Sequence, residues 1–368
     1  MRVKRGTMKT YKIAAVPGDG IGPEVIPAGL TVLGRAADRF GFSIETTSFE
    51  WGAGYYKQHG HFMPGDGLDI LRRFDAVYFG AVGLPDVDDT LPAKDYTFKV
   101  RTGFMQYVNY RPVRTWPGVA RPLRTEKPID FVVIRENVEG EFVQAGKQIL
   151  PDDVGGLAID TSIFTRRGIE RIAHYAFQLA RKRRKRLHHI TKSNTLIYSL
   201  TFWDRVIREV AAQYPDVEHQ QMYIDNAAAS FVLRPEIFDV VLTTNLFGDI
   251  LSDLGGALMG SLGLAGSGNI NPEREFPSMF EPIHGSAPDI AGRGIANPYG
   301  TIWSGALMLE HLGELQAARQ IVKAMDKATA EGALPADLGG KATTGEIARR
   351  VAENLDLVQE QPCPESST

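Results

Sequence analysis

Residues 12–40, KIAAVPGDGIGPEVIPAGLTVLGRAADRF, decide the fold class because an apolar segment runs through a glycine-rich turn directly into a helical pattern. We expect a short buried strand at 12–16 and a helix at about 23–40. Further along the chain, apolar, β-rich runs predict strands at 75–82, 130–134 and 239–243. Strands that alternate with helices are typical of an α/β protein with a largely parallel sheet, in which ligands bind beside the carboxyl ends of strands.

Two further helices are predicted later in the chain. One follows Thr165, a suitable N-cap, and another begins near Asn245, directly after the strand at 239–243. The apolar residues of the first helix recur at helical spacing: Ile169, Ile172, Ala173, Ala176, Phe177 and Ala180.

The composition argues against nucleic-acid binding. The chain has 368 residues, of which 43% are hydrophobic, so it is long enough for two cores. Lys and Arg number 41 against 44 Asp and Glu, and this balance favours neither nucleic acid nor an anionic membrane. The most basic run, RKRRKR at 181–186, follows a predicted helix, where cations are favourable, and has no interleaved aromatic residues. We therefore interpret it as a solvated helix end.

The sequence also indicates a cytoplasmic protein without a membrane partner. Its single cysteine, Cys363, lies in a polar tail, so there is no disulfide framework and a reducing compartment fits best. The basic start leads into no apolar stretch, and no segment approaches the roughly 18 apolar residues of a membrane span.

The glycine-rich turn, Gly18-Asp-Gly-Ile-Gly22, admits two interpretations. Glycines let the backbone approach a ligand, and the following helix offers free N–H groups. However, the spacing is GxGxG and not the GxGxxG of the dinucleotide fingerprint, and no acid follows at the expected place. The segment is either a ligand-binding element or only a tight turn.

Asp249 and Asp253 lie four residues apart in a predicted helix, so both carboxylates can point to the same side. Like charges at this spacing repel, and a hard divalent cation such as Mg²⁺ or Mn²⁺ would offset the repulsion with oxygen ligands. The alternative is one acid that favours the helix dipole and one solvated acid.

Four cationic residues could contact an anionic substrate. Arg101, Arg111 and Arg135 follow strand-like or loop segments, and guanidinium groups suit bidentate recognition of carboxylates. Lys192 ends a short β-like run and could act as a general base. Taken singly, each could equally be a solvated or ion-paired surface residue.

Taken together and in order, these segments resemble the isocitrate/isopropylmalate dehydrogenase family of β-decarboxylating dehydrogenases. The resemblance covers nearly the whole chain and rests on these blocks: Gly18-Asp-Gly-Ile-Gly-Pro-Glu24, Tyr107-Val-Asn-Tyr-Arg111-Pro, Arg135-Glu-Asn, Thr191-Lys192-Ser-Asn194, Tyr223-Ile-Asp225, Asn245-Leu-Phe-Gly-Asp249-Ile-Leu-Ser-Asp253, Glu281-Pro-Ile-His284-Gly-Ser-Ala-Pro-Asp289 and Ala296-Asn297-Pro. It implies a two-domain isopropylmalate dehydrogenase-like fold with a mostly parallel sheet, not a Rossmann fold, which explains the mismatched glycine fingerprint.

The resemblance also implies a domain division and an assembly. Residues 1–106 and 260–368 would form a large domain with the NAD-binding loop. Residues 107–259 would form a small domain that carries the dimer interface. Because active sites in this family are built from two chains, the implied assembly is a homodimer.

The roles of individual residues follow from the same resemblance. Arg101, Arg111 and Arg135 would hold the substrate carboxylates. Asp249 and Asp253, joined by an Asp225 from the partner subunit, would hold Mg²⁺ or Mn²⁺. Lys192, also from the partner, would assist removal of the hydroxyl proton, so Lys192 and Asp225 are the implied catalytic residues.

The implied cofactor is NAD, bound along the loop from His284 to Asn297. Asp289 matches the acid that binds the adenosine ribose in NAD-using members, where NADP-using members have a lysine. A carboxylate would accept hydrogen bonds from the ribose hydroxyls and repel a 2′-phosphate. The implied cofactor-binding residues are His284, Gly285, Ser286, Ala287, Asp289 and Asn297.

Within the family, the chain looks most like the tartrate dehydrogenase/decarboxylase and D-malate dehydrogenase branch, which implies oxidation of a small 2-hydroxy dicarboxylic acid. One position departs from the family: Phe142 stands where other members carry a tyrosine that protonates the enolate. Phenylalanine has no O–H, so we expect oxidation to survive and protonation after decarboxylation to be slow. The alternatives are a 3-isopropylmalate-like dehydrogenase and a catalytically impaired binding or regulatory relative.

Overall fold

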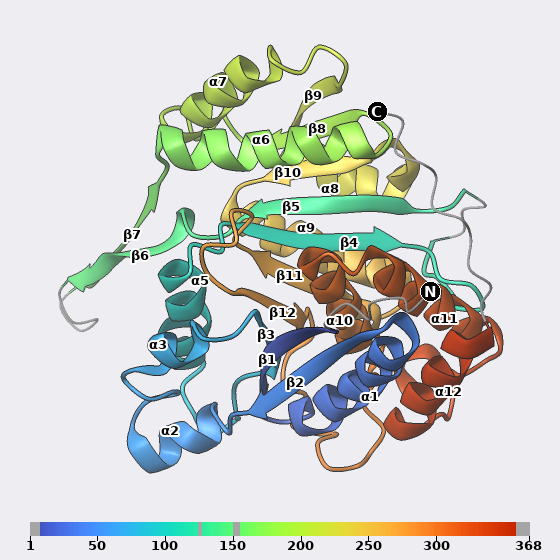
Figure 1. The fold of residues 1–368 in the computed structure, drawn as a ribbon. Helices are drawn as coiled ribbons and strands as arrows, with labels where there is room; N and C mark the ends of the chain where they lie inside the picture. The colour runs from blue at the N-terminus through green and yellow to red at the C-terminus, as the bar shows by residue number, and fades with distance from the viewer. Residues whose placement is uncertain (1–7, 124–126, 150–154, 358–368) are drawn as a thin grey trace, which may run out of the picture.

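A computed structural model describes residues 8–123, 127–149 and 155–357 (Figure 1). Cys363 lies outside the described residues. Two sheets are present: one of ten strands in the order β2-β1-β3-β12-β11-β4-β5-β10-β8-β9, and a separate pair, β6-β7. The strands are β1 (Lys9–Gly18), β2 (Phe42–Ser48), β3 (Ala76–Ala81), β4 (Val108–Arg114), β5 (Asp130–Glu136), β6 (Gly140–Ile149), β7 (Leu157–Ile163), β8 (Arg186–Thr191), β9 (Glu218–Tyr223), β10 (Val240–Thr243), β11 (Gly266–Ile270) and β12 (Ser278–Pro282).

Helices cover the large sheet and connect its strands. They are α1 (Gly22–Phe40), α2 (Ala53–His59), α3 (Gly67–Leu71), α4 (Thr90–Pro92), the π-helical turn η1 (Ala93–Phe98), α5 (Lys99–Gly103), α6 (Arg166–Lys182), α7 (Ser199–Ala211), α8 (Ile224–Leu233), α9 (Asn245–Met259), α10 (Tyr299–Leu312), α11 (Leu315–Ala330) and α12 (Thr344–Leu357). Short 3₁₀ turns occur at η3 (Pro235–Ile237), η4 (Leu262–Leu264) and η5 (Ala336–Leu338). None of the described helices is both long and apolar enough to cross a membrane.

The elements predicted from the sequence are present. All four predicted strands form, as β1, β3, β5 and β10, and the three predicted helices form as α1, α6 and α9. Thr165 is the N-cap of α6, and its side chain accepts a hydrogen bond from the backbone N–H of Gly168. The predicted α/β class with a mostly parallel sheet is confirmed, since parallel pairs flank an antiparallel centre.

Strand directions reverse at the centre of the sheet. Strand β4 is antiparallel to both of its neighbours, β11 and β5, and β11 is antiparallel to β12. The two flanks of the sheet therefore run in opposite directions, and their carboxyl ends do not share one edge. Candidate residues still lie at the carboxyl ends of individual strands: Arg135 near the end of β5 and Lys192 directly after β8. Arg111 instead lies in the middle of β4.

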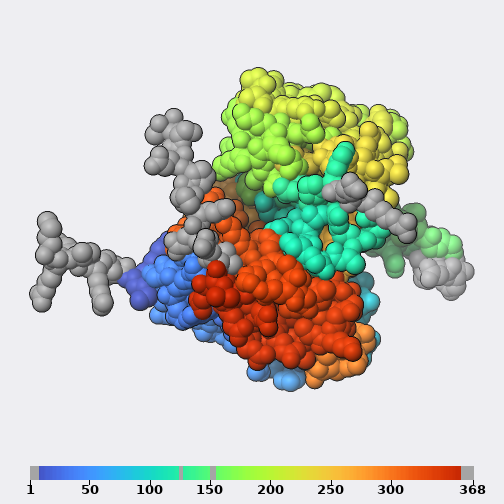
Figure 2. All heavy atoms as spheres, turned by 90° about the vertical axis from the view of Figure 1, so that its right-hand side faces the viewer, coloured from blue at the N-terminus to red at the C-terminus, as the bar shows by residue number. Residues whose placement is uncertain are grey.

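The strands divide into two groups by their place in the sequence. One half of the sheet comes from both ends of the chain and consists of β1, β2, β3, β11 and β12; the other half, the inserted strands β4, β5, β8, β9 and β10, comes from its middle. In Figure 2 the inserted part forms the upper lobe, in green and yellow, and the chain ends form the lower one, in blue and red. The residue bounds of the two domains stay a prediction.

The basic run at 181–186 is ion-paired and not simply solvated. It starts in the last turn of α6 and continues into β8, and four of its arginines pair with nearby acids. The pairs are Arg181–Asp216, Arg183–Asp239, Arg184–Asp130 and Arg186–Glu218, with N···O distances of 2.6 to 3.1 Å. These acids lie close to the ends of neighbouring strands, so the run serves to neutralise them.

Candidate active site

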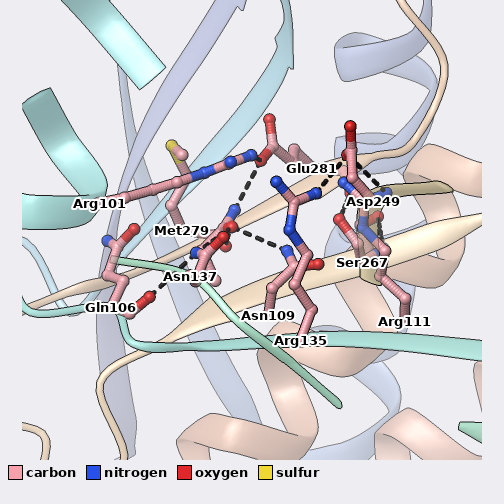
Figure 3. Close-up of polar contacts among 12 residues, drawn as sticks. Arg101, Gln106, Asn109, Arg111, Arg135, Asn137, Asp249, Ser267, Met279 and Glu281 are labelled. Carbon is pink, nitrogen blue, oxygen red and sulfur yellow. Dashed lines mark hydrogen bonds and ion pairs between the residues drawn. The ribbon is translucent and has the colours of Figure 1, made fainter. Parts of the chain in front are cut away.

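Three buried arginines meet beside the antiparallel centre of the sheet (Figure 3). Arg111 lies in the middle of β4, and Arg135 lies near the end of β5. Arg101 lies on helix α5, so our expectation that it follows a strand or loop was wrong. All three are at most 6% exposed, and Arg135 is only 1% exposed. The structure thus brings together the three arginines that the sequence singled out.

Carboxylates partly neutralise these guanidinium groups. Arg135 Nη1 forms an ion pair with Asp249 Oδ1. Arg111 Nη1 lies 3.3 Å from Asp253 Oδ1 and 3.7 Å from Asp249 Oδ1. Arg101 Nη2 lies 2.8 Å from Glu281 Oε1. Both acids predicted on one helix face therefore point at the arginines.

A glycine allows α9 to hold Asp249 against the sheet. A Cβ atom at Gly248 would lie 2.4 Å from Thr243 Oγ1 and 2.6 Å from Arg135 Cβ. Only a residue without a side chain lets the first turn of α9 pack this closely on β5 and β10. The side chains of Asp249 and Asp253 remain 44% and 54% exposed, so their oxygens are accessible to a ligand.

The cluster shifts the acidity of its members. Burial lowers the pKa of Arg111 and of Arg135, and the charges of neighbouring arginines lower it further. Burial alone would raise the pKa of Asp249, but the nearby Arg135 and Arg111 outweigh it, and the net pKa is lowered. Burial raises the pKa of Asp253, which only Arg111 and Arg135 counteract. Asp249 is therefore the more readily ionised of the two acids.

An amide network that the sequence analysis missed lies behind the Arg101–Glu281 pair. Asn269 on β11 donates from Nδ2 to Glu281 Oε1 at 2.6 Å. Its Oδ1 accepts from the side chains of Asn109 and Asn137, each at 2.9 Å. Glu281 was noticed only as part of a motif, because its contact with Asn269 depends on the register between β11 and β12. No signal in a single sequence reveals that register.

Phe142 lies in the site, beside the substrate-binding candidates. Its ring centroid is 5.3 Å from Arg135 Cζ and 5.8 Å from the ring of Phe98. The neighbouring Glu141 fixes this placement, because its carboxylate accepts from Thr244 Oγ1 and from the backbone N–H of Leu246 at the start of α9. The position that departs from the family thus contributes an apolar ring, and no hydroxyl, next to Arg135.

Lys192 and Asp225 form a pair of their own. Lys192 follows β8 directly, and its Nζ lies 2.5 Å from Asp225 Oδ1 on α8. This hydrogen bond lowers the pKa of the Asp225 carboxyl. Within the described part of one chain, no group of three or more His, Cys, Asp or Glu side chains could hold a metal ion. One chain therefore does not bring Asp225 to Asp249 and Asp253.

The glycine-rich turn contacts the loop of residues 284–297, which we call the cofactor loop. Ile21 N–H donates to Ser286 O at 2.8 Å, and a Cβ at Gly20, which has φ +59°, would lie only 1.9 Å from the same oxygen. Asp19 accepts from the backbone N–H groups of Ala53, Gly54 and Gly83. Close backbone packing therefore explains the glycines, as expected of a tight turn.

The cofactor loop borders an open pocket. A cavity of about 410 Å³ is lined by residues 82–85 and by Asp89, Pro92, Ala93, Thr97, Gly285, Ser286 and Pro288. Asp289 is exposed. His284 Nε2 is buried and has no hydrogen-bond partner among the described residues. Asn297 is buried, and its side chain holds the loop by donating to Asp337 Oδ2 at 2.9 Å.

A family model described as isocitrate/isopropylmalate dehydrogenase matches residues 12–351. The chain belongs to this family. Among its similar relatives, a probable tartrate dehydrogenase/decarboxylase of Agrobacterium vitis is 50% identical over 95% of this chain and 98% of its own length. The D-malate dehydrogenase [decarboxylating] of Escherichia coli is 49% identical over 94% and 99%. The tartrate dehydrogenase/decarboxylase of Pseudomonas putida is 48% identical over 94% and 98%.

Solved structures agree with the assignment to the isocitrate/isopropylmalate dehydrogenase family. The isocitrate dehydrogenase of Methylococcus capsulatus superposes with a TM-score of 0.84 at 33% identity and covers 94% of this chain and 99% of its own. The TT0538 protein of Thermus thermophilus gives 0.83 at 36% identity, over 94% and 68%. The predicted family and its fold are thereby confirmed, and relatives from the predicted branch are among the similar proteins. The roles of the site residues stay predictions.

Proposed function

We propose that the chain is an NAD- and divalent-metal-dependent dehydrogenase of a small 2-hydroxy dicarboxylic acid, of the tartrate or D-malate type. The observation that carries the proposal is the cluster of three buried guanidinium groups, two of which pair with the accessible carboxylates of α9. Burying cations costs free energy unless anions pair with them, and Asp249 and Asp253 supply the anions for Arg111 and Arg135. If a metal ion takes these two carboxylates, a dicarboxylate substrate would replace them as the partner of the arginines. Relatives that share about half of the sequence are named for tartrate and D-malate.

The acids of α9 fit a hard divalent cation. Asp249 and Asp253 offer accessible oxygen donors on one helix face, and oxygen is the donor that Mg²⁺ and Mn²⁺ prefer. Since one chain holds no complete metal-binding group among its described residues, we propose that Asp225 from a second copy provides the third carboxylate. When bound, the metal would act as a Lewis acid toward the substrate's hydroxyl and adjacent carboxylate.

The surface around Lys192 and Asp225 supports a homodimer. Large apolar side chains are exposed in the segment after Lys192 and on helices α8 and α9, with Tyr198 87% exposed. They are Leu196, Ile197, Tyr198, Val232, Leu233 and Ile250. Exposed apolar patches of this kind mark protein interfaces. A second copy on this surface would cover the patch and carry Lys192 and Asp225 toward the partner's arginines.

The cofactor loop supports NAD as the hydride acceptor. Residues of this loop line the open pocket, and the exposed Asp289 beside them can accept hydrogen bonds from a nucleotide. The buried His284 Nε2, in the same loop, has no hydrogen-bond partner among the described residues. We propose that Asp289 binds the adenosine ribose and excludes a 2′-phosphate by charge repulsion. Gly285, Ser286, Ala287 and Asn297 would shape the loop around the cofactor.

The side chains would share the chemistry as follows. Arg101, Arg111 and Arg135 orient the carboxylates of the acid and bury them away from water. Lys192 takes the proton of the hydroxyl as hydride leaves the carbon. The arginines then balance negative charge as CO₂ departs. Phe142 cannot return a proton to the enolate, so water or another donor has to do so.

A second candidate activity is oxidation of a 3-alkylmalate. The rings of Phe98 and Phe142, which touch beside the arginines, favour an alkyl substituent because they offer no hydrogen-bond partner to a hydroxyl. Because Phe142 lacks the tyrosine hydroxyl, a catalytically impaired binding or regulatory protein is a further candidate.

We place the enzyme in the cytoplasm from its composition.

The decisive experiment is NADH formation from D-malate, L-tartrate, meso-tartrate, 3-isopropylmalate and isocitrate, each with Mn²⁺ and then with EDTA. Metal-dependent turnover of a tartrate or D-malate supports the proposal. Turnover of 3-isopropylmalate instead supports the second candidate. If no acid is oxidised but calorimetry detects NAD binding, the chain is a binding protein. Asp253→Asn should weaken Mn²⁺ dependence, whereas Asp356→Asn, an exposed acid paired with Arg35, should not.

A further inference from the structure

A buried polar cluster lies beneath the turn that carries Lys192. Asp204 on α7 is 2% exposed, and its carboxylate lies 3.3 Å from His189 Nε2 and 3.0 Å from Gln221 Nε2. Thr191 and Ser193 also contribute to lowering the pKa of this carboxyl. His189 lies on β8 three residues before Lys192, so the carboxylate holds the strand that leads into the turn.

The histidines behind Asp204 fix its orientation. His189 Nδ1 and His219 Nε2 are 2.7 Å apart, so one proton lies between them. Burial and the neighbouring His189 lower the pKa of His219 to about 4, so His219 is neutral at physiological pH. With His189 Nε2–H donating to Asp204, its Nδ1 must accept from His219, which sets the tautomers of both rings. The hydrogen bonds from His219 to His189 and from His189 to Asp204 thus fix the orientation of the carboxylate.

Burying the Asp204 carboxylate costs free energy, which indicates a role beyond packing. Along α7 the neighbours of Asp204 include Trp203, Val206 and Ile207, which are fully buried. Burying an apolar residue at position 204 would cost less free energy than burying a carboxylate. A buried carboxylate needs all of its hydrogen bonds, and these go to His189 on β8 and to Gln221 on β9. The carboxylate therefore fixes the end of the strand that leads into Lys192, whose own side chain is partly exposed.

We propose that Asp204 is a positioning residue for Lys192, and that the chain His219–His189–Asp204 holds the turn at 191–193 in the geometry that proton transfer requires. The proposal rests on the proposed function, in which Lys192 removes the hydroxyl proton. Asp204 itself touches no substrate or cofactor. A general base displaced by about 1 Å can lose on the order of 100-fold in rate, so the effect should appear in kcat.

The test is a double-mutant cycle with Asp204→Asn and Lys192→Ala, measured on the full-length protein with whichever acid the wild type oxidises. Asp204→Asn should lower kcat roughly 10- to 100-fold, with KM for the acid and for NAD within about threefold of wild type. In the Lys192→Ala background the same change should have no further effect, because no lysine remains to be positioned. An equal loss in both backgrounds would overturn the proposal and assign Asp204 a merely structural role.

Two further variants control for folding. Asp239→Asn removes another carboxylate of similar burial, paired with Arg183, and should lower stability without lowering kcat. Gln221→Ala removes a single donor to Asp204 and should lower kcat less than Asp204→Asn; if Asp204→Asn does not fold, an unchanged kcat in Gln221→Ala refutes the proposal. Failure of the proposed function would show differently, as a wild type that oxidises none of the acids.

Discussion

Replacing Phe142 by tyrosine should restore the missing proton donor. The ring lies 5.3 Å from Arg135 Cζ and is half-buried, so a tyrosine keeps the same ring and adds a hydroxyl in the site. Because Tyr and Phe rings attract a guanidinium similarly, the contact with Arg135 should persist. At a half-buried position the added hydroxyl should change the free energy of unfolding by no more than about 0.5 kcal/mol.

The expected gain is set by what a general acid contributes. A positioned donor is worth about 10²- to 10⁴-fold, or roughly 2.7 to 5.4 kcal/mol of barrier, on the step it serves. If protonation of the enolate limits the wild type, Phe142→Tyr should raise the rate of keto-acid formation from D-malate by up to this factor. The first oxidation, in which NADH forms, should change little because position 142 takes no part in hydride transfer.

The assay follows NADH, CO₂ and the final keto acid in single-turnover and steady-state reactions with D-malate. In the wild type, NADH and CO₂ should both form ahead of the keto acid, because CO₂ leaves before the enolate is protonated; in Phe142→Tyr this lag should shrink. Phe98→Tyr places a hydroxyl on the adjacent ring and serves as the matched control, with no rescue expected. Keto-acid formation without a lag behind NADH and CO₂ in the wild type would refute the reasoning.

Three other perturbations test the site and its surroundings. Glu281→Gln should destabilise the protein by about 3 to 5 kcal/mol, because it leaves buried Arg101 without the anion 2.8 Å away; urea midpoints at fixed protein concentration measure this, and a loss under about 1 kcal/mol would contradict it. Gly20→Ala should raise KM for NAD at least about tenfold with KM for the acid unchanged, since its Cβ would meet Ser286 O at 1.9 Å and displace the cofactor loop. Burial raises the pKa of Glu136 from 4.5 to about 7, so ionisation destabilises the folded state as pH rises through this window. Glu136→Gln should therefore gain Tm relative to wild type between pH 5 and pH 8, and parallel Tm profiles would show that the shift is absent.

The sequence predicted those elements whose signal is local. Alternating apolar runs and helical spacing gave the strands and helices, and Thr165 marked the start of α6 correctly. The spacing of Asp249 and Asp253 predicted one helix face, and that face indeed points at Arg111. These features depend on residues a few positions apart, so a single sequence contains them.

Features that depend on strand register could not be predicted. The antiparallel pairing of β4 with β11 and β5 places Arg111 in the site, and nothing local specifies that pairing. Glu281 pairs with Arg101 across 180 residues of sequence, and Asp204 on α7 contacts His189 near the end of β8. Arg101 was placed after a loop although it lies in the last turns of a helical segment that runs through α4, η1 and α5.

The sheet order also constrains how the chain reaches its native state. Asn109 on β4 and Asn269 on β11 are hydrogen-bonded neighbours although 160 positions separate them. Closing so long a loop is entropically expensive and slow, whereas β1 pairs with β2 and β3, and β8 with β9, over much shorter separations. We expect these strands to gain amide protection before β11 and β12 in pulsed hydrogen exchange, and simultaneous protection of β11 and β12 would contradict this. On a ribosome, β3 would keep one edge unpaired until β12 has emerged, and a nascent chain stalled before residue 266 would expose that edge to chaperones.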